Sequence, residues 1–155
     1  MRRAVLLILA TGLASLGFNG AIAGSAWAQA AKTPVSFVDS TTLSVPGRAW
    51  VSGHVFHLRQ GVDTGTVHGD LEGTITLRVN INTDLHTGRG VVFGKFWLSA
   101  ADVTWTGSFN GKLTSDASRG RFIGQGSDGS KLMGTFTQIA PGTDQDEAII
   151  LSPHG

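Results

Sequence analysis

The sequence predicts an all-β domain, namely an eight-stranded antiparallel up-and-down β-barrel, and three observations carry this prediction. Apolar and polar residues alternate strictly over long stretches, which fits strands with one buried face and does not fit a helix. Glycine is abundant, with 22 residues, and stands among threonine, valine, phenylalanine and tryptophan, a composition typical of β-structure. Short clusters of turn residues separate the alternating stretches, and no amphipathic helix of about ten residues fits between them.

The clearest alternation runs from Thr66 to Asn82, where odd positions are apolar or glycine and even positions are polar. It predicts one long strand that is bent near Gly69 or Gly73, and the same pattern recurs from Asp102 to Leu113. Closing an antiparallel meander into a barrel removes both edge strands and encloses an interior that is filled by side chains or holds one small ligand. The expected strands cover residues 35–42, 49–59, 65–82, 90–99, 102–113, 120–126, 130–138 and 147–152.

The strand predicted over 90–99 differs from the others because residues 91–98 are apolar on both faces apart from Lys95. Closing the barrel buries only one of these two rows, and soluble proteins rarely leave a large apolar patch in water. We therefore expect a homo-oligomer that uses Phe93 and Trp97. The alternative is that residues 31–45 fold across this row within one chain.

The N-terminus has the three parts of a secretory signal peptide: Met1-Arg2-Arg3, an apolar run too short to span a bilayer, and small residues around Ala28. We expect a signal peptide over 1–28, a single β-barrel domain over 29–155, and a secreted or periplasmic protein. Without any cysteine the chain has neither a disulfide nor the usual lipid-attachment residue, so no membrane anchor is expected after cleavage. Twelve basic and 11 acidic residues, with no basic cluster, argue against binding to nucleic acid.

The segment from Trp105 to Thr137 resembles the barrel of allene oxide cyclases and plant dirigent proteins. The resemblance rests on Gly120, Phe122, Gly124 and Gly126, followed by a partner strand with Gly134-Thr135-Phe136. It implies an eight-stranded barrel, often trimeric, in a family that includes cofactor-free cyclases, stereochemical guides and proteins of unknown role. The catalytic carboxylates of the plant enzymes have no position here that a motif matches, so the resemblance implies a fold and not a reaction.

Polar residues offer few candidates for catalysis or metal binding. His68, Asp70 and Glu72 share one face of the predicted strand 65–82 and are weak candidates for proton transfer, the alternative being an ordinary solvated strand face. His54 and His57 are three residues apart and point to opposite faces of a strand, so they cannot chelate one ion. The sequence predicts neither a metal site nor a cofactor.

Aromatic residues favour a binding function instead. Trp105, Phe109, Phe122 and Phe136 are expected to hold a small apolar ligand inside the barrel, although filling a core is the alternative role for each. A cofactor-free cyclase or isomerase, in which His68 together with Asp70 or Glu72 moves a proton, is the second hypothesis. A structural or interaction module of the cell envelope, built on residues 91–98, is the third. The face of Thr66–Asn82 that points inward discriminates between them.

Overall fold

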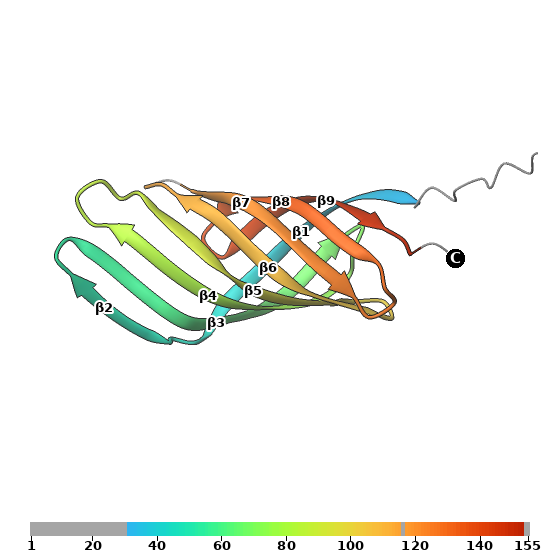
Figure 1. Ribbon diagram of the computed structural model, residues 1–155, viewed down its shortest axis with the longest axis horizontal. Helices are drawn as coiled ribbons and strands as arrows, with labels where there is room; N and C mark the ends of the chain where they lie inside the picture. Colours follow the sequence, from blue (N-terminus) through green and yellow to red (C-terminus); the bar gives the residue numbers. More distant parts are fainter. Residues whose placement is uncertain (1–30, 116, 154–155) are drawn as a thin grey trace, which may run out of the picture.

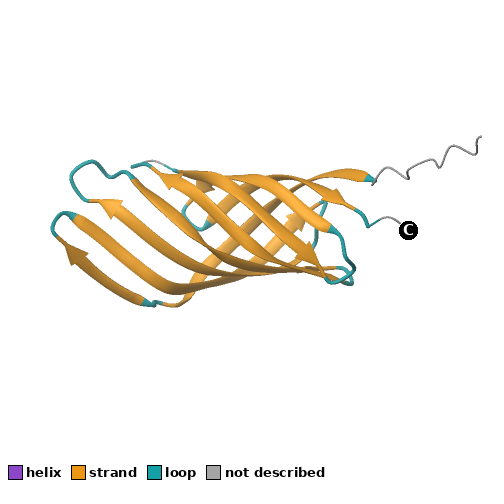
Figure 2. Ribbon diagram, in the orientation of Figure 1, coloured by secondary structure: helices purple, strands orange, loops and turns teal. Residues whose placement is uncertain are grey.

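One antiparallel β-sheet closes on itself in a computed structural model, which describes residues 31–115 and 117–153 (Figure 1, Figure 2). Eight strands form the barrel because β1 pairs with both β9 and β3, while the short strand β2 pairs with β3 alone. The predicted eight-stranded antiparallel barrel is therefore confirmed, with β2 as one extra strand. The strands are β1 (Lys32–Val45), β2 (Arg48–Ser52), β3 (Val55–Gly69), β4 (Gly73–Asp84), β5 (Gly90–Ala100), β6 (Val103–Leu113), β7 (Ser118–Gly126), β8 (Lys131–Ala140) and β9 (Thr143–Leu151).

The expected signal peptide over 1–28 lies outside the described residues. Within the described residues, the chain has no helix long and apolar enough to cross a membrane.

Two strand predictions, 49–59 and 65–82, are wrong because each runs through a hairpin turn. The chain reverses between β3 and β4, where the Glu72 carboxylate accepts the backbone N–H of Gly69 at 3.0 Å. Val67 before this turn, Leu71 within it and Ile75 after it are all buried inside the barrel. The reversal thus keeps the odd positions on the inner face, so the alternation continues through it and conceals it.

Inward-facing glycines make room for phenylalanine rings on neighbouring strands. A methyl group added at Gly107 would lie 2.6 Å from Cε1 of Phe96, and one at Gly124 would lie 2.7 Å from Cζ of the same ring. Both glycines therefore allow the Phe96 ring to approach the backbone closely. The same relationship recurs for Phe109 with Gly94, for Phe122 with Gly134, and for Phe136 with Gly111 and Gly120.

The barrel is filled with side chains at the end where β1 begins and β9 ends, an end that Figure 1 shows on the right. Val67, Leu98 and Leu132 are fully buried there. The indole N–H of Trp105 donates to Oγ of Ser130 at 2.9 Å, which satisfies both polar groups inside the core.

The outer row of β5 remains on the surface. Val91 and Phe93 are exposed, while Val92, Phe96 and Leu98 face the interior. The alternative in which residues 31–45 cover this row is wrong, because Lys32–Val45 forms β1 between β9 and β3.

Two arginine side chains partly cover the outer row instead. The guanidinium of Arg59 lies 5.7 Å from the centre of the Phe93 ring, and that of Arg78 lies 5.5 Å from the Trp97 ring.

Candidate functional site

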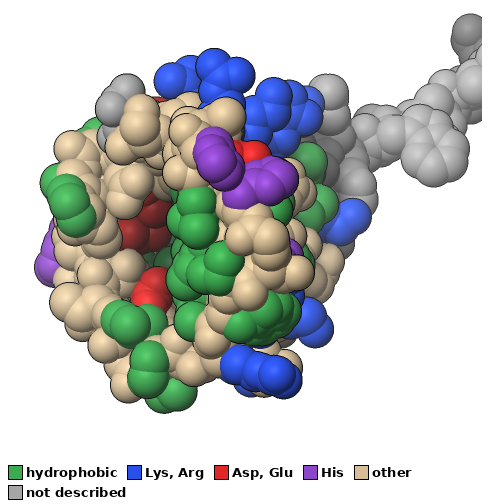
Figure 3. All heavy atoms as spheres, turned by 90° about the vertical axis from the view of Figure 1, so that its left-hand side faces the viewer, with side chains coloured by type: hydrophobic (Ala, Val, Ile, Leu, Met, Phe, Trp, Pro, Cys, Tyr) green, Lys and Arg blue, Asp and Glu red, His purple; other side chains and the backbone are tan. Residues whose placement is uncertain are grey.

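The barrel encloses a cavity of about 230 Å³ towards the end that carries the β4–β5, β6–β7 and β8–β9 connections. Figure 3 looks into this end and shows a hollow with acidic side chains inside it. Leu98 and Leu132 belong both to the packed core and to the cavity lining, so they separate the filled end from the hollow end. The interior is therefore a pocket with one mouth.

One wall of the cavity is apolar and aromatic. It consists of the inner faces of β4 to β8, and Phe109 and Phe136 meet edge to face with ring centres 6.1 Å apart. Phe96 and Phe122 make a second edge-to-face pair at 5.8 Å. Such pairs are favourable ring arrangements, and the glycines opposite them keep each ring against the wall.

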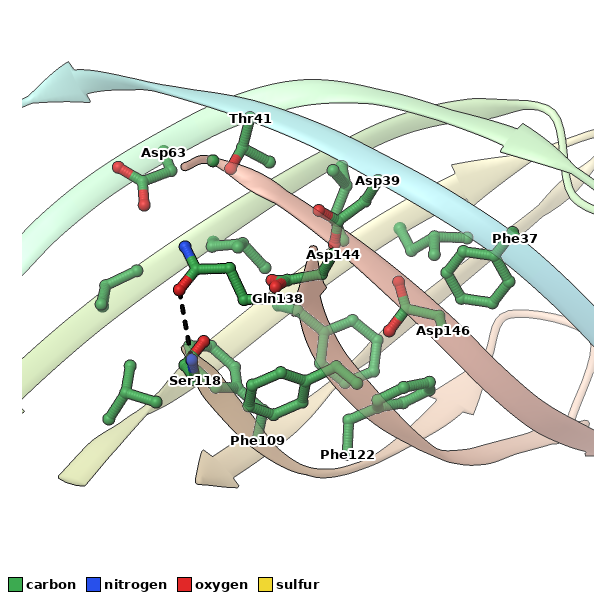
Figure 4. A pocket seen from close by; sticks show the side chains of 18 of the residues that line it. Phe37, Asp39, Thr41, Asp63, Phe109, Ser118, Phe122, Gln138, Asp144 and Asp146 are labelled. Carbon is green, nitrogen blue, oxygen red and sulfur yellow. Dashed lines mark hydrogen bonds between the residues drawn. The ribbon is translucent and has the colours of Figure 1, made fainter. Parts of the chain in front are cut away.

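The other wall is acidic. Asp39 on β1 and Asp144 on β9 are direct partners in the antiparallel register, and Asp146 follows two residues along the same face of β9. Figure 4 shows these three carboxyl groups on one side of the pocket, with Phe109 and Phe122 on the other. Asp63 on β3 adds a fourth carboxyl group to the lining.

Two of the carboxyl groups are buried, and three of them are incompletely hydrogen-bonded. Asp39 is 5% exposed and Asp146 is 3% exposed. Among the described residues, no hydrogen-bond partner lies within reach of Oδ1 of Asp39, Oδ1 of Asp144 or Oδ2 of Asp146. The cavity-lining side chains of this part of the chain include no Lys, Arg or His. The acidic wall therefore has no counter-charge in the described lining.

This environment raises the pKa values of the carboxyl groups. Burial raises the pKa of Asp39 to about 7, and the nearby Asp144 adds to the effect. Burial raises the pKa of Asp144 to about 6. The pKa of Asp146 rises to about 8 through burial and then through the charges of Asp39 and Asp144. Near neutral pH the cluster therefore holds protons and can donate them, accept them or exchange them for a cation.

The structure brings together three of the four residues predicted to bind a ligand. Phe109, Phe122 and Phe136 line the cavity on adjacent strands. Trp105 lies in the packed core, hydrogen-bonded to Ser130, and is not part of the cavity lining.

His68, Asp70 and Glu72 lie on the outside of the barrel, at the turn between β3 and β4, and all three are exposed. Their expected arrangement on one face of a continuous strand is wrong, because the chain turns at residues 70–72. Nδ1 of His68 lies 2.8 Å from Oε2 of Glu72, and Asp70 accepts the backbone N–H of Ser36. These contacts hold the turn, and none of the three residues lines the cavity.

Sequence reasoning missed the acidic wall, although a signal for it exists. Val35, Phe37 and Asp39 are two positions apart and lie on the same face of β1, and Asp146 lies on the same face of β9 as Ala148. A carboxyl group in phase with the buried residues of its strand is directed inwards. The parity of each strand could therefore have identified the inward-facing aspartates.

Histidines and carboxylates elsewhere in the described residues do not form a metal site. Nε2 of His54 lies 3.2 Å from Oδ2 of Asp84, and the His54 and His86 rings meet edge to face at 5.2 Å. Across residues 31–115 and 117–153, no three His, Asp or Glu side chains are arranged so that they could hold a metal ion.

Comparison with known proteins gives no family for this chain: no protein-family model matches it, and no curated protein sequence matches it significantly. The resemblance to allene oxide cyclases and dirigent proteins stays a prediction.

Proposed function

We propose that this protein binds a small, largely apolar molecule inside its barrel. The observation that carries this proposal is the one-mouthed cavity with a wall of phenylalanine rings. Sites for small molecules are concave and mostly apolar, with a few polar groups that orient the ligand. At about 230 Å³ the cavity lies below the roughly 300–1,000 Å³ typical of drug-sized ligands. It suits a single ring or a short chain.

The pairing of rings with glycines supports binding because it preforms the cavity. The Phe96 ring lies against Gly107 and Gly124, and the Phe136 ring lies against Gly111 and Gly120. A ring that occupies the space next to a glycine leaves more of the barrel's centre open. A site that exists before the ligand arrives loses less free energy to ordering when the ligand binds.

Native mass spectrometry of the protein purified from its own source tests the proposal, because a retained ligand and the subunit number appear together. We expect a bound small molecule in the natural protein. Leu77→Trp fills the cavity and should abolish the retained mass, whereas Thr74→Trp, on the exposed face of the same strand, should keep it. Equal retention by both variants would show that the ligand lies outside the barrel.

A cofactor-free isomerase or cyclase is a second candidate, and one observation favours it. Asp39 and Asp146 have pKa values of about 7 and 8 and face aromatic rings. A general acid or base works best with a pKa near the operating pH. In this candidate function the proton moves through these carboxyl groups and not through His68. Turnover that Asp146→Asn abolishes, while the variant still binds the substrate, would support it.

A further inference from the structure

We propose that the ligand carries a positively charged nitrogen, which the acidic wall formed by Asp39, Asp144 and Asp146 holds while the phenylalanine wall holds its apolar part. This inference rests on the proposed binding function and specifies the class of ligand.

The first support is the geometry of the acidic wall. Asp39 and Asp144 are register partners on adjacent strands, and Asp146 lies on the same face of β9. Each has one carboxyl oxygen without a hydrogen-bond partner among the described residues. Asp39 and Asp146 are more than nine-tenths buried, and both residues line the cavity.

The second support is the missing counter-charge. Among residues 31–115 and 117–153, the titratable groups that face the cavity are Asp39 from β1, Asp63 from β3, and Asp144 and Asp146 from β9, all of them acidic. A buried carboxylate is strongly unfavourable unless it is paired. A cationic ligand would provide the pairing that the described lining does not.

The third support is the opposite wall, which selects the kind of cation. The faces of aromatic rings attract an organic ammonium group, and the same rings bury hydrocarbon. Calcium requires six to eight oxygen ligands, and magnesium requires octahedral oxygen coordination. The wall facing the carboxyl groups offers phenylalanine and aliphatic side chains instead. The combination fits a compact amine with an apolar body.

Two probes of nearly the same shape test the inference: 2-phenylethylamine, which is cationic at neutral pH, and 2-phenylethanol, which is neutral. At pH 8 we expect the purified protein to bind the amine about tenfold or more tightly than the alcohol, as hydrogen bonds to charged groups allow. At pH 5, where the carboxyl groups are protonated, the preference should fall below about threefold. Calorimetry at pH 7 in buffers of different ionisation enthalpy should show proton release with the amine and none with the alcohol.

Matched variants test whether the acidic wall causes the preference for the amine. Asp39→Asn and Asp146→Asn keep the side-chain size and should remove the preference for the amine while leaving alcohol binding within about twofold. Asp102→Asn makes the same charge change at an exposed turn and should leave the preference intact. Circular dichroism of each variant checks that it folds.

Equal binding of the two probes at pH 8 would overturn the inference, as would an amine preference unchanged in Asp39→Asn and Asp146→Asn, or a preference for the alcohol that grows as the pH falls. The last would show that protonated carboxyl groups donate to a neutral ligand. In each of these cases the inference about the amine fails. If the protein still binds the alcohol and Leu77→Trp abolishes this binding, the proposed binding function is nevertheless supported. Failure of both probes to bind at pH 8 would also overturn the inference, and native mass spectrometry would then decide the binding function separately.

Discussion

Asp39 on β1 and Asp144 on β9 are direct partners in the antiparallel register, and both side chains point into the barrel cavity. Side chains at such positions have Cβ atoms about 4.5–5.5 Å apart, and like charges there repel. Asp146 adds a third buried carboxyl group on the same face. An arrangement that opposes folding in this way is expected at a functional site, where the geometry required for binding or chemistry outweighs local stability.

The acidic wall should make the protein less stable as the pH rises through neutrality. The pKa values of Asp39 and Asp146 are about 7 and 8 in the folded protein, above the ordinary value of 3.8. At pH values between the ordinary pKa and the raised pKa of each group, the folded state binds more protons than the unfolded state. The free energy of unfolding therefore falls with increasing pH in this range. Denaturant titrations from about pH 4.5 to 8.5 should show a loss on the order of 5–8 kcal/mol.

The double variant Asp39→Asn/Asp146→Asn should remove most of this pH dependence, because asparagine does not ionise. Asp102→Asn, which is exposed, should leave the dependence unchanged. A stability that stays flat over this range in the natural protein would contradict the raised pKa values.

Gly107 should not tolerate a side chain. A Cβ atom there would overlap the backbone oxygen of Ile123 and lie 2.6 Å from the Phe96 ring. We expect Gly107→Ala to lower the free energy of unfolding by about 3 kcal/mol, at the upper end for overpacking. The neighbouring Ser108→Ala, on the exposed face, should change it by no more than about 0.5 kcal/mol. Equal losses in urea denaturation would show that the inner and outer faces of β6 have been exchanged.

The outer row of β5 should mediate association. Phe93 is exposed and Trp97 lies in the same row, and an arginine guanidinium lies near each of the two rings. We propose a homo-oligomer through this row, with a trimer suggested by the family resemblance alone. Sedimentation at tens of micromolar should give a mass above that of one chain, and Trp97→Lys should reduce it. A natural protein that sediments as a monomer would rule out this interface.

Export remains a prediction of the sequence. Small residues precede two possible cleavage points, after Ala28 or after Ala30. N-terminal sequencing of protein recovered from outside the cytoplasm should therefore begin at Gln29 or Ala31. Recovery of a chain that still begins at Met1 would refute both the cleavage and the proposed compartment.

The sequence predicted the strands of the C-terminal half well. β5 to β8 lie close to their expected bounds, and Phe109, Phe122 and Phe136 face the interior as expected. The region from Ala49 to Asn82 was harder to predict, because two hairpin turns interrupt what reads as two continuous strands. The turn at residues 70–72 preserves the parity of the buried positions, so no change of pattern marks it.

The sequence by itself determined the all-β class and the separation of most strands into an apolar face and a polar face, because alternation is a local property of an extended backbone. Only the tertiary structure decided that Asp39, Asp144 and Asp146 meet on one wall opposite the phenylalanine rings. Asp39 and Asp144 lie near opposite ends of the domain and become neighbours only when β1 closes the barrel against β9. That closure and its register depend on the pairing of whole strands, which local alternation does not encode.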